Sequence, residues 1–305
     1  MTYPRTVLLT GASGYAGAAI VACLRAAGIR VLTAGRRPDD DIAFDLADAK
    51  HWDSLSVPPG VDVCIHAAAA TERLCRDDPV AAHTINVTAT RALLRALERA
   101  GVGNVIYLST FHVFGHPRGG IDEDTLPVPA NDYGLTHLMA EQAVMLHARR
   151  TGARATVLRP ANLFGTPARW ESFDRWSLAP FDFARQAAST GRIRLLSDGS
   201  PVRAYVSLDD VCNAACAAIN GQLPTLTHLS GRAWSMAELA RACAQVASEA
   251  TGQVVPVELG RAGQPEQPFE FRSRHWAAEA DASGKSMARF LRDVLAHVDV
   301  QKSVA

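Results

Sequence analysis

Three glycines at intervals of three residues stand near the start of the chain, in the run Gly11-Ala-Ser-Gly14-Tyr-Ala-Gly17. This spacing permits a tight turn, a close approach of the backbone to a pyrophosphate, and close packing of a helix on a strand. A helix that begins there offers free N–H groups and the positive end of its dipole. The run follows a short apolar segment at residues 6–10 and opens a helix of small residues. In this context it predicts dinucleotide binding, although a merely tight turn is the alternative.

Two arginines, Arg36 and Arg37, follow the second predicted strand, where a dinucleotide enzyme selects its cofactor. An enzyme that prefers NAD usually places Asp or Glu here to accept a hydrogen bond from the ribose 2′-OH. A guanidinium instead pairs with a 2′-phosphate in a two-pronged, charge-assisted contact. We therefore expect NADP (NADPH) as the cofactor, with NAD less favoured. The alternative is that both arginines are solvated on a loop.

Alternating strands and helices must position these residues. Short apolar runs predict strands at residues 6–10, 30–34, 42–44, 61–66, 104–109 and 155–159, and periodic segments predict helices at 16–27, 79–100 and 133–151. This alternation implies a parallel sheet with right-handed crossovers. We predict an α/β fold: a doubly wound Rossmann-type parallel sheet with a smaller C-terminal substrate-binding region.

The rhythm becomes irregular beyond residue 165. Residues 1–165 are expected to form a dinucleotide-binding Rossmann domain, with 203–220 packing back onto it, and 166–305 mainly a substrate-binding region. Because ligands of open α/β sheets bind beyond the carboxyl ends of the strands, the irregular region should hold the substrate there. Trp170 and Trp176 flank this entrance, either stacking on a ligand or forming the core of an aromatic lid.

The composition limits the partners of the chain. Lys+Arg and Asp+Glu balance at 31 each, so no broad field attracts nucleic acid or an anionic membrane. No segment approaches the ~20 apolar residues of a membrane span, and no signal peptide is recognisable, so a cytoplasmic protein is expected. The six cysteines form no CxxC pair, and no HxxxH or HExxH pair of histidines lies on a predicted helix. No metal site is predicted.

Together these segments resemble the extended short-chain dehydrogenase/reductases, also called the NAD-dependent epimerase/dehydratase family. The similarity covers roughly residues 6–220 and consists of eight landmarks in order. They are the glycine loop (10–17), Asp45-Leu46, the alanine-rich strand end (62–69), Asn86, the segment LSTFHVFG (108–115), the helix that starts at Tyr133, RPANLFG (159–165) and RAYVSLDD (203–210). By this resemblance the cofactor would contact Gly11, Ser13, Gly14, Tyr15, Ala16, Gly17, Arg36, Arg37, Asp45, Leu46, Ala67, Ala68, Ala69, Asn86, Ser109, Tyr133, His137, Pro160, Asn162 and Leu163.

The resemblance also implies a set of catalytic residues. Tyr133 would donate or accept the proton of the reacting oxygen, and Thr110 would hydrogen-bond the same oxygen while the nicotinamide exchanges the hydride. A phenol is a poor base at pH 7 unless a nearby positive charge lowers its pKa. Four residues after Tyr133 the family has Lys, whereas this chain has His137, which can hydrogen-bond the ribose but is mostly neutral near pH 7. The chain is thus an active enzyme that tolerates His, an enzyme helped by the charge of the nicotinamide, or a binding protein without turnover.

The residues after Thr110 bear on the reaction. The family's 4,6-dehydratases carry an Asp-Glu pair there, and this chain has Phe111 and His112, so dehydration is disfavoured. The segment looks more like that of the 4-ketoreductases of deoxysugar pathways, such as dTDP-4-dehydrorhamnose reductase. We expect NADPH-dependent reduction of a keto group, at C4, on a nucleotide-diphosphate sugar. The alternatives are an epimerase, which would oxidise C4 transiently or use His112 as a base, and a catalytically silent NADP-binding regulator.

For the substrate, the resemblance implies contacts with Thr110, Phe111, His112, Asn162 and Arg203. Arg203 would clamp the diphosphate, unless it forms a surface salt bridge. The helices near 79–100 and 133–151 are those through which the family dimerises, and the second carries Leu138, Met139, Met145 and Leu146. A homodimer is therefore expected.

Overall fold

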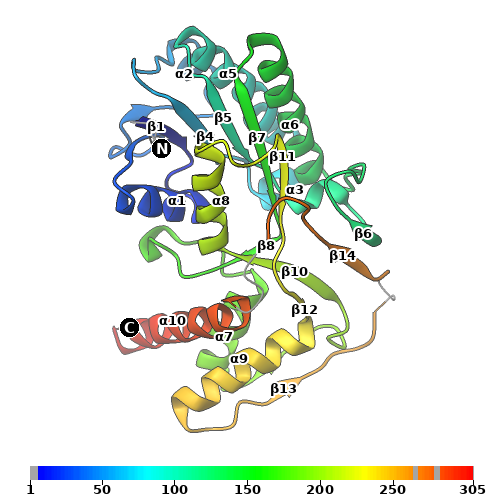
Figure 1. Ribbon diagram of the computed structural model, residues 1–305. Coiled ribbons are helices and arrows are strands. Elements are labelled where there is room, and N and C mark those ends of the chain that lie inside the picture. The colour runs from blue at the N-terminus through cyan, green and yellow to red at the C-terminus, as the bar shows by residue number, and fades with distance from the viewer. Residues whose placement is uncertain (1–5, 264–266, 278–281, 305) are drawn as a thin grey trace.

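A parallel sheet of seven strands positions the glycine-rich turn. The structure, a computed structural model, describes residues 6–263, 267–277 and 282–304 (Figure 1). The strand order is β3–β2–β1–β4–β5–β7–β11, and every neighbouring pair is parallel. The strands are β1 (Thr6–Thr10), β2 (Arg30–Gly35), β3 (Ile42–Ala43), β4 (Val63–His66), β5 (Asn104–Leu108), β7 (Arg154–Pro160) and β11 (Leu226–Leu229). The prediction of a doubly wound Rossmann-type sheet is confirmed, and β11 adds a seventh strand that the sequence analysis missed.

Helices cover both faces of this sheet (Figure 1). Helices α1 (Tyr15–Ala26) and α8 (Leu208–Ile219) lie together on one face, and α2 (Ala49–Ser54), α5 (Ala89–Arg99) and α6 (Asp132–Thr151) on the other. Successive side chains of a strand point to opposite faces. Leu9 accordingly packs in the core under α1 and α8, while Leu8 packs in the core under α5 and α6. Burial on both faces explains why β1 is an uninterrupted run of buried residues.

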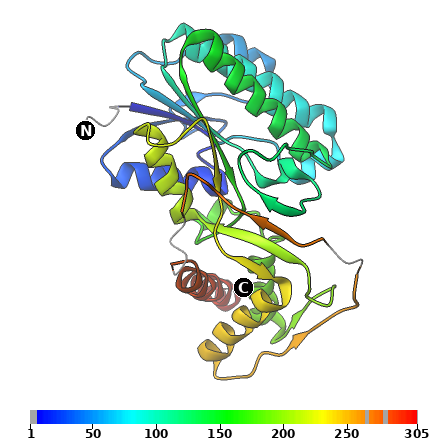
Figure 2. The same ribbon diagram turned by 45° about the vertical axis from the view of Figure 1, so that its right-hand side comes forward.

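A smaller lobe, the cap, lies beyond the carboxyl ends of the strands (Figure 2). Helices α7 (Ala179–Thr190), α9 (Met236–Thr251) and α10 (Ala282–Val304) pack on one another around Phe181, Leu239 and Phe290. Short strands form three small sheets: β8 (Asn162–Phe164), β10 (Val202–Ser207) and β12 (Ala233–Ser235); β9 (Ile193–Arg194) and β13 (Val257–Glu258); β6 (Gly119–Ile121) and β14 (Phe269–Phe271). The first of these sheets packs against the cores of both lobes.

The helix predicted over residues 79–100 is interrupted in the structure. It consists of α4 (Pro79–His83), the π-helical turn η1 (Thr84–Thr88) and α5. Within η1, the buried Asn86 accepts a hydrogen bond from the backbone N–H of Ala70 (2.6 Å) and donates one to Thr136 Oγ1 (2.8 Å). The extra residue of a π turn lets the Asn86 amide satisfy both partners. The predicted helix is therefore confirmed over residues 79–99, but apolar periodicity cannot reveal the π turn within it.

The exposed side of α6 carries only part of the apolar surface on which the homodimer was predicted. Leu135, Met139 and Leu146 are exposed, while Leu138 and Met145 pack against the cores of the sheet. The homodimer stays a prediction.

In the described part of the chain, no helix combines the length and the apolar character needed to cross a bilayer.

A buried ion pair joins α6 to the ends of β5 and β7. The Arg159 guanidinium donates through Nε to Glu141 Oε1 (2.9 Å) and through Nη2 to Glu141 Oε2 (2.6 Å). The Ser109 hydroxyl, which follows β5, also donates to Glu141 Oε1 (2.5 Å). Both charged side chains are almost fully buried, and the guanidinium lies over the Phe114 ring, 5.2 Å from its centroid. The pair therefore fixes how α6 lies along the sheet.

We expect Arg159→Met to lower the free energy of unfolding by about 3–5 kcal/mol, because it leaves the Glu141 carboxylate buried without a counter-charge. The double variant Arg159→Met/Glu141→Leu should recover most of this loss, since no isolated charge remains. Urea denaturation measures both effects. Arg150→Met, which removes an exposed pair with Glu98, is the control and should change the stability far less. Equal effects of Arg159→Met and Arg150→Met would contradict this account.

Candidate active site

A cavity of about 650 Å³ lies at the carboxyl ends of the central strands, under the cap. It includes the point between β1 and β4 where the strand order reverses, the usual ligand crevice of open α/β sheets. Every residue predicted for the cofactor or the substrate lines this cavity except Asn86, Phe111 and Arg203. The sheet thus brings together most of the predicted site from segments far apart in the sequence.

The glycines of the turn form one wall of the cavity with backbone atoms alone. Gly11 has φ +78°, and a Cβ on it would lie 2.7 Å from the backbone N of Ala68. A Cβ on Gly17 would lie 2.1 Å from the Gly11 carbonyl oxygen. The N-terminus of α1 therefore packs directly on the turn, and its N-cap, Gly14, has no side chain that could occupy the first N–H groups. This cradle fits the pyrophosphate of a dinucleotide.

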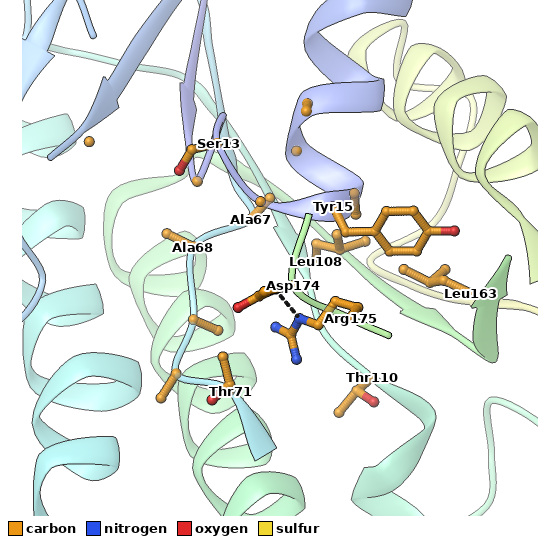
Figure 3. Close-up of a pocket in the computed structure, with 18 of the residues that line it drawn as sticks. Ser13, Tyr15, Ala67, Ala68, Thr71, Leu108, Thr110, Leu163, Asp174 and Arg175 are labelled. Carbon is orange, nitrogen blue, oxygen red and sulfur yellow. Dashed lines mark ion pairs between the residues drawn. The ribbon is translucent and has the colours of Figure 1, made fainter. Parts of the chain in front are cut away.

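Tyr15 has a different role from its neighbours in this turn. Its ring lies beside Leu163 in Figure 3, and its hydroxyl donates to the carbonyl oxygen of Gly165 (2.7 Å). The ring also packs edge-on against Phe173 and Phe181, with centroid distances of 5.4 and 5.8 Å. Tyr15 thus couples the glycine turn to the cap.

The end of β2 presents arginines to the cavity. The Arg37 guanidinium is held by Asp39, with Nε 2.9 Å from Oδ1, and Arg169 of the cap segment reaches the same carboxylate at 3.4 Å. Arg36 is exposed and forms no ion pair with any residue in the described ranges. Its guanidinium is therefore available to an anion at this end of the cavity. Asp45, which also lines the cavity, accepts a hydrogen bond from the Ala47 N–H (2.9 Å).

Thr110 and Tyr133 meet at the opposite end of the cavity. Thr110 caps the 3-10 turn η2 (Phe111–Phe114), where its hydroxyl oxygen accepts a hydrogen bond from the His112 N–H (3.2 Å), and Tyr133 lines the same cavity. Burial raises the pKa of Tyr133, as do Glu72 and Cys75 more weakly, while Arg175 and the Thr110 hydroxyl oppose the shift. The Tyr133 phenol is therefore protonated at neutral pH.

His137 lies one helical turn after Tyr133, and the two ring centroids are 4.7 Å apart. Burial, assisted by His66 and His112, lowers the pKa of His137 to about 3. The imidazole is consequently neutral across the physiological pH range. Where the family has the charged side chain of Lys, this chain places no positive charge.

His112 is the third titratable side chain at this end of the cavity. Its ring lies 5.6 Å from that of Tyr133. Burial lowers the pKa of His112, Arg203 lowers it further, and Glu72 opposes the shift. His112 is thus neutral at pH 7, and burial has weakened it as a base.

Three predicted residues lie outside the cavity wall. Phe111 is buried in an aromatic cluster, stacked on Phe269 at 5.5 Å, because the 3-10 turn directs it into the core and leaves His112 at the wall. Arg203, on β10, donates to the Val202 carbonyl oxygen (2.8 Å). Asn86 braces the chain beneath the cavity through its two hydrogen bonds. Predicting Phe111 as a substrate contact overlooked the turn that follows Thr110.

The sequence analysis missed two parts of the wall. One is Thr71, Glu72 and Leu74, at the start of α3 (Glu72–Asp77). The other is the cap segment 167–178, which includes η3 (Trp170–Ser172) and brings Arg175 into the cavity. In Figure 3, the Arg175 side chain lies between Thr71 and Thr110, with its Nε 3.4 Å from Asp174 Oδ1. Arginines among aromatic residues at 169–176 were the available signal.

The cap segment is held by aromatic packing. Trp170 stacks on His297 with ring centroids 3.9 Å apart, and Trp176 lies behind Trp170 at 6.0 Å. These tryptophans form the core of the cap segment, and neither lines the cavity. Of the alternatives for them, the aromatic lid core is the one that this packing supports.

The described residues contain no group of three or more His, Cys, Asp or Glu side chains that could hold a metal ion. All six cysteines are free thiols. The polar side chains that line the cavity are instead hydroxyls, neutral imidazoles, arginines and the carboxylates of Asp45, Glu72 and Asp174, together with a glycine cradle. Such a set suits an anionic dinucleotide and a hydroxyl or carbonyl substrate.

Comparisons with known proteins agree with this arrangement. The model of the NAD dependent epimerase/dehydratase family matches residues 7–225. A UDP-glucose 4-epimerase of Azospirillum brasilense is 29% identical over 292 residues, which cover 86% of this chain and 82% of that protein. A dTDP-6-deoxy-L-talose 4-dehydrogenase (NAD(P)(+)) of Kitasatospora kifunensis is 26% identical and covers 100% of this chain and 98% of its own length.

Solved structures show the same fold. That of RMD from Pseudomonas aeruginosa complexed with NADPH superposes with a TM-score of 0.79 at 24% identity, covering 97% of this chain and 98% of that one. Its sequence identity is low, so it supports the architecture alone. The family match spans well over half of the chain and includes the glycine cradle, Thr110, Tyr133 and His137. The chain therefore belongs to the NAD-dependent epimerase/dehydratase family, whose members are NAD(P)-dependent oxidoreductases and epimerases that act on nucleotide sugars.

Proposed function

We propose that the protein is an NADPH-dependent ketoreductase that reduces a keto group, at C4, on a nucleotide-diphosphate sugar. The feature that carries the proposal is the place of Tyr133 in the cavity beside His137, where burial raises the pKa of the phenol and lowers that of the imidazole. Reduction of a ketone requires an acid that gives a proton to the oxygen, whereas oxidation of an alcohol requires a base. The site holds the proton that reduction needs.

The side chains of this chain perform the proton transfer in reduction. The ketone oxygen would accept hydrogen bonds from the Thr110 hydroxyl and the Tyr133 phenol, which orient the carbonyl and polarise it. Bound NADPH supplies the hydride. As charge develops on the oxygen, the Tyr133 proton moves to it and the Thr110 hydroxyl holds the reacting oxygen in place. Thr110 and Tyr133 both line the cavity, so one carbonyl oxygen would reach both hydroxyls.

Epimerisation is the second candidate, favoured by the likeness to the UDP-glucose 4-epimerase of Azospirillum brasilense. Transient oxidation at C4 would need Tyr133 as a base, and burial raises the pKa of this phenol. Proton abstraction beside a ketone would need His112, and burial lowers the pKa of that imidazole. Both routes therefore work against the electrostatics of the cavity. A silent regulator would have no use for the pair of hydroxyls that Thr110 and Tyr133 bring to the cavity.

For the cofactor, we propose NADPH in preference to NADH. Arg36 is the arginine at the end of β2 that no acidic side chain of the described residues engages, and it lines the cavity. A ribose 2′-phosphate would supply the missing negative partner. Arg37 is paired with Asp39 and would contribute only its positive charge to this phosphate site.

For the substrate, we propose Arg175 in the role that the resemblance gave to Arg203. Arg175 lines the cavity near Thr110, and its charge acts on Tyr133. A guanidinium at this place suits the diphosphate of a nucleotide sugar entering under the cap. Asn162 also lines the cavity, and its side-chain amide donates to the Ala204 carbonyl oxygen (3.0 Å), which anchors β8 on β10.

The reaction is tested by the oxidation of NADPH in the presence of a panel of 4-keto nucleotide sugars. We expect turnover with at least one of them, and Tyr133→Phe should lower kcat by about 10²–10⁴-fold because the proton donor is lost. Tyr205→Phe, which removes another buried phenol hydroxyl, is the matched control and should keep its activity. Binding of NADPH without turnover on any member of the panel would favour the regulator.

The protonation of Tyr133 predicts the pH profile of reduction. The raised pKa keeps the acid form present below pH 10, so kcat should be level from pH 6 to 9 and fall only at higher pH. His137→Lys places an ammonium beside the phenol, lowers its pKa, and should move the falling limb to lower pH. It should also accelerate alcohol oxidation at neutral pH. Arg175, Glu72, Cys75 and His112 also face Tyr133 and are unchanged in this comparison. An unshifted profile in His137→Lys would oppose the proposal.

Arg36→Ala should reduce the preference for NADPH over NADH, measured as the ratio of the two kcat/KM values. A charge-assisted contact is worth about 1.5–3 kcal/mol, which corresponds to a change in this ratio of about 10–100-fold. The efficiency with NADH should change little. The exposed Arg91 on α5 provides the control substitution, Arg91→Ala. A wild-type protein that prefers NADH would refute the cofactor assignment.

Arg175→Ala should raise the KM for the nucleotide sugar about tenfold or more and leave the Kd for NADPH nearly unchanged, since the lost contact belongs to the substrate. Steady-state kinetics and a cofactor titration separate the two effects. Arg185→Ala on α7, which removes an exposed arginine paired with Asp182, is the control. If Arg175→Ala weakened NADPH binding and left the KM for the sugar unaltered, Arg175 would belong to the cofactor instead.

A further inference from the structure

Two side chains on one face of the sheet form hydrogen bonds with two successive turns of α6. Side-chain alternation along β5 places Tyr107 and Ser109 on the face that α6 covers. There Ser109 bonds Glu141, and the Tyr107 hydroxyl lies 2.8 Å from His137 Nδ1. Both rings of the second pair are buried, with Tyr107 1% and His137 3% exposed. The Tyr107 phenol on the sheet thus holds the His137 imidazole in place beside Tyr133.

The direction of this hydrogen bond follows from the needs of the phenol. A buried hydroxyl must donate its proton, and the Tyr107 hydroxyl has His137 Nδ1 as its hydrogen-bond partner in the described part of the chain. Burial raises the pKa of Tyr107 well above its ordinary value, so the phenol keeps this proton. Because Nδ1 accepts, the proton of the neutral imidazole must be on Nε2.

The Nε2 atom is the other half of the observation. It is buried and makes no hydrogen bond with any residue that the structure describes. An N–H donor without a partner in a buried position is costly, and such groups are normally paired in the functional state. His137 lines the cavity beside Tyr133, so a ligand in the cavity can supply the missing acceptor.

We propose that Tyr107 is a positioning residue, whose hydroxyl fixes His137 as the Nε2–H tautomer and so presents an N–H donor to a ribose hydroxyl of bound NADPH. The proposal rests on the cofactor assignment made above, and it does not require turnover. It divides the two tasks of a lysine at this position. His137 would keep the hydrogen bond to the cofactor, and it supplies no positive charge to Tyr133. The donor is neutral and therefore acts alike from acid to alkaline pH.

The tautomer can be observed directly in the cofactor-free protein. Long-range ¹H–¹⁵N correlation spectra of histidine-labelled protein distinguish Nδ1–H from Nε2–H imidazoles, and His137→Gln identifies the resonances of His137. We expect one tautomer, Nε2–H, from pH 5 to 9, and a shift of Nε2 but little change in Nδ1 when NADPH is added. A wild-type His137 that is protonated on Nδ1, or an Nε2 resonance that NADPH leaves unmoved, would overturn the proposal.

Tyr107→Phe tests the positioning role, because it removes only the hydroxyl. We expect a second tautomer of His137 to appear and the Kd for NADPH, from nicotinamide fluorescence, to rise about tenfold. Tyr205→Phe is the matched control and should alter neither readout. If Tyr107→Phe kept the wild-type tautomer and the wild-type Kd, Tyr107 would have no positioning role.

The outcomes are separable from those that test the proposed reaction. If Tyr107→Phe does not fold, the wild-type spectra with and without NADPH decide the question alone. Absence of turnover on every keto sugar, with the Nε2–H tautomer and its response to NADPH intact, would refute the ketoreductase and leave the tautomer proposal standing. Turnover with an Nδ1–H tautomer would do the reverse.

Discussion

Burial of one face of α6 against the ends of β5 and β7 determines both the geometry and the protonation of the site. Tyr133, His137 and Glu141 follow one another on this face at intervals of four residues. Glu141 is fixed by Arg159 and Ser109, which sets the register of the helix along the sheet. With the helix held there, Tyr133 lines the cavity together with Thr110, and the same burial keeps Tyr133 protonated and His137 neutral. Packing and acid–base chemistry thus have one cause.

This constraint also separates the reactions that the fold can support. Related chains include a 4-epimerase and a 4-dehydrogenase, so the family match alone does not choose between them. Folds host many functions, and the choice must come from the site itself. Here the phenol of Tyr133 is protonated, and the neighbouring imidazoles are weak bases. This arrangement favours giving a proton to a ketone over taking one from an alcohol.

The sequence predicts the part of the molecule that local chemistry dictates. The glycine spacing needs a backbone without side chains, and short buried strands need apolar runs, so the phosphate cradle and the order of strands and helices were accessible. The orientation of Phe111, the π turn at Asn86 and the entry of Arg175 were not. Each depends on contacts between segments distant in the sequence, such as those of Asn86 with Ala70 and Thr136. Tyr107 could have been found from strand alternation, had the face covered by α6 been known.

The central claim is that Tyr133 holds its proton at neutral pH because burial outweighs the opposing charge of Arg175. The most direct measurement is a pH titration of the ¹³Cζ resonances of tyrosine-labelled, cofactor-free protein, with Tyr133→Phe to assign the signal. The account predicts that the Tyr133 resonance remains that of a phenol at least to pH 10, the ordinary pKa of tyrosine. Titration of Tyr133 between pH 6 and 8 would show that the site is poised as a base, and would contradict the account.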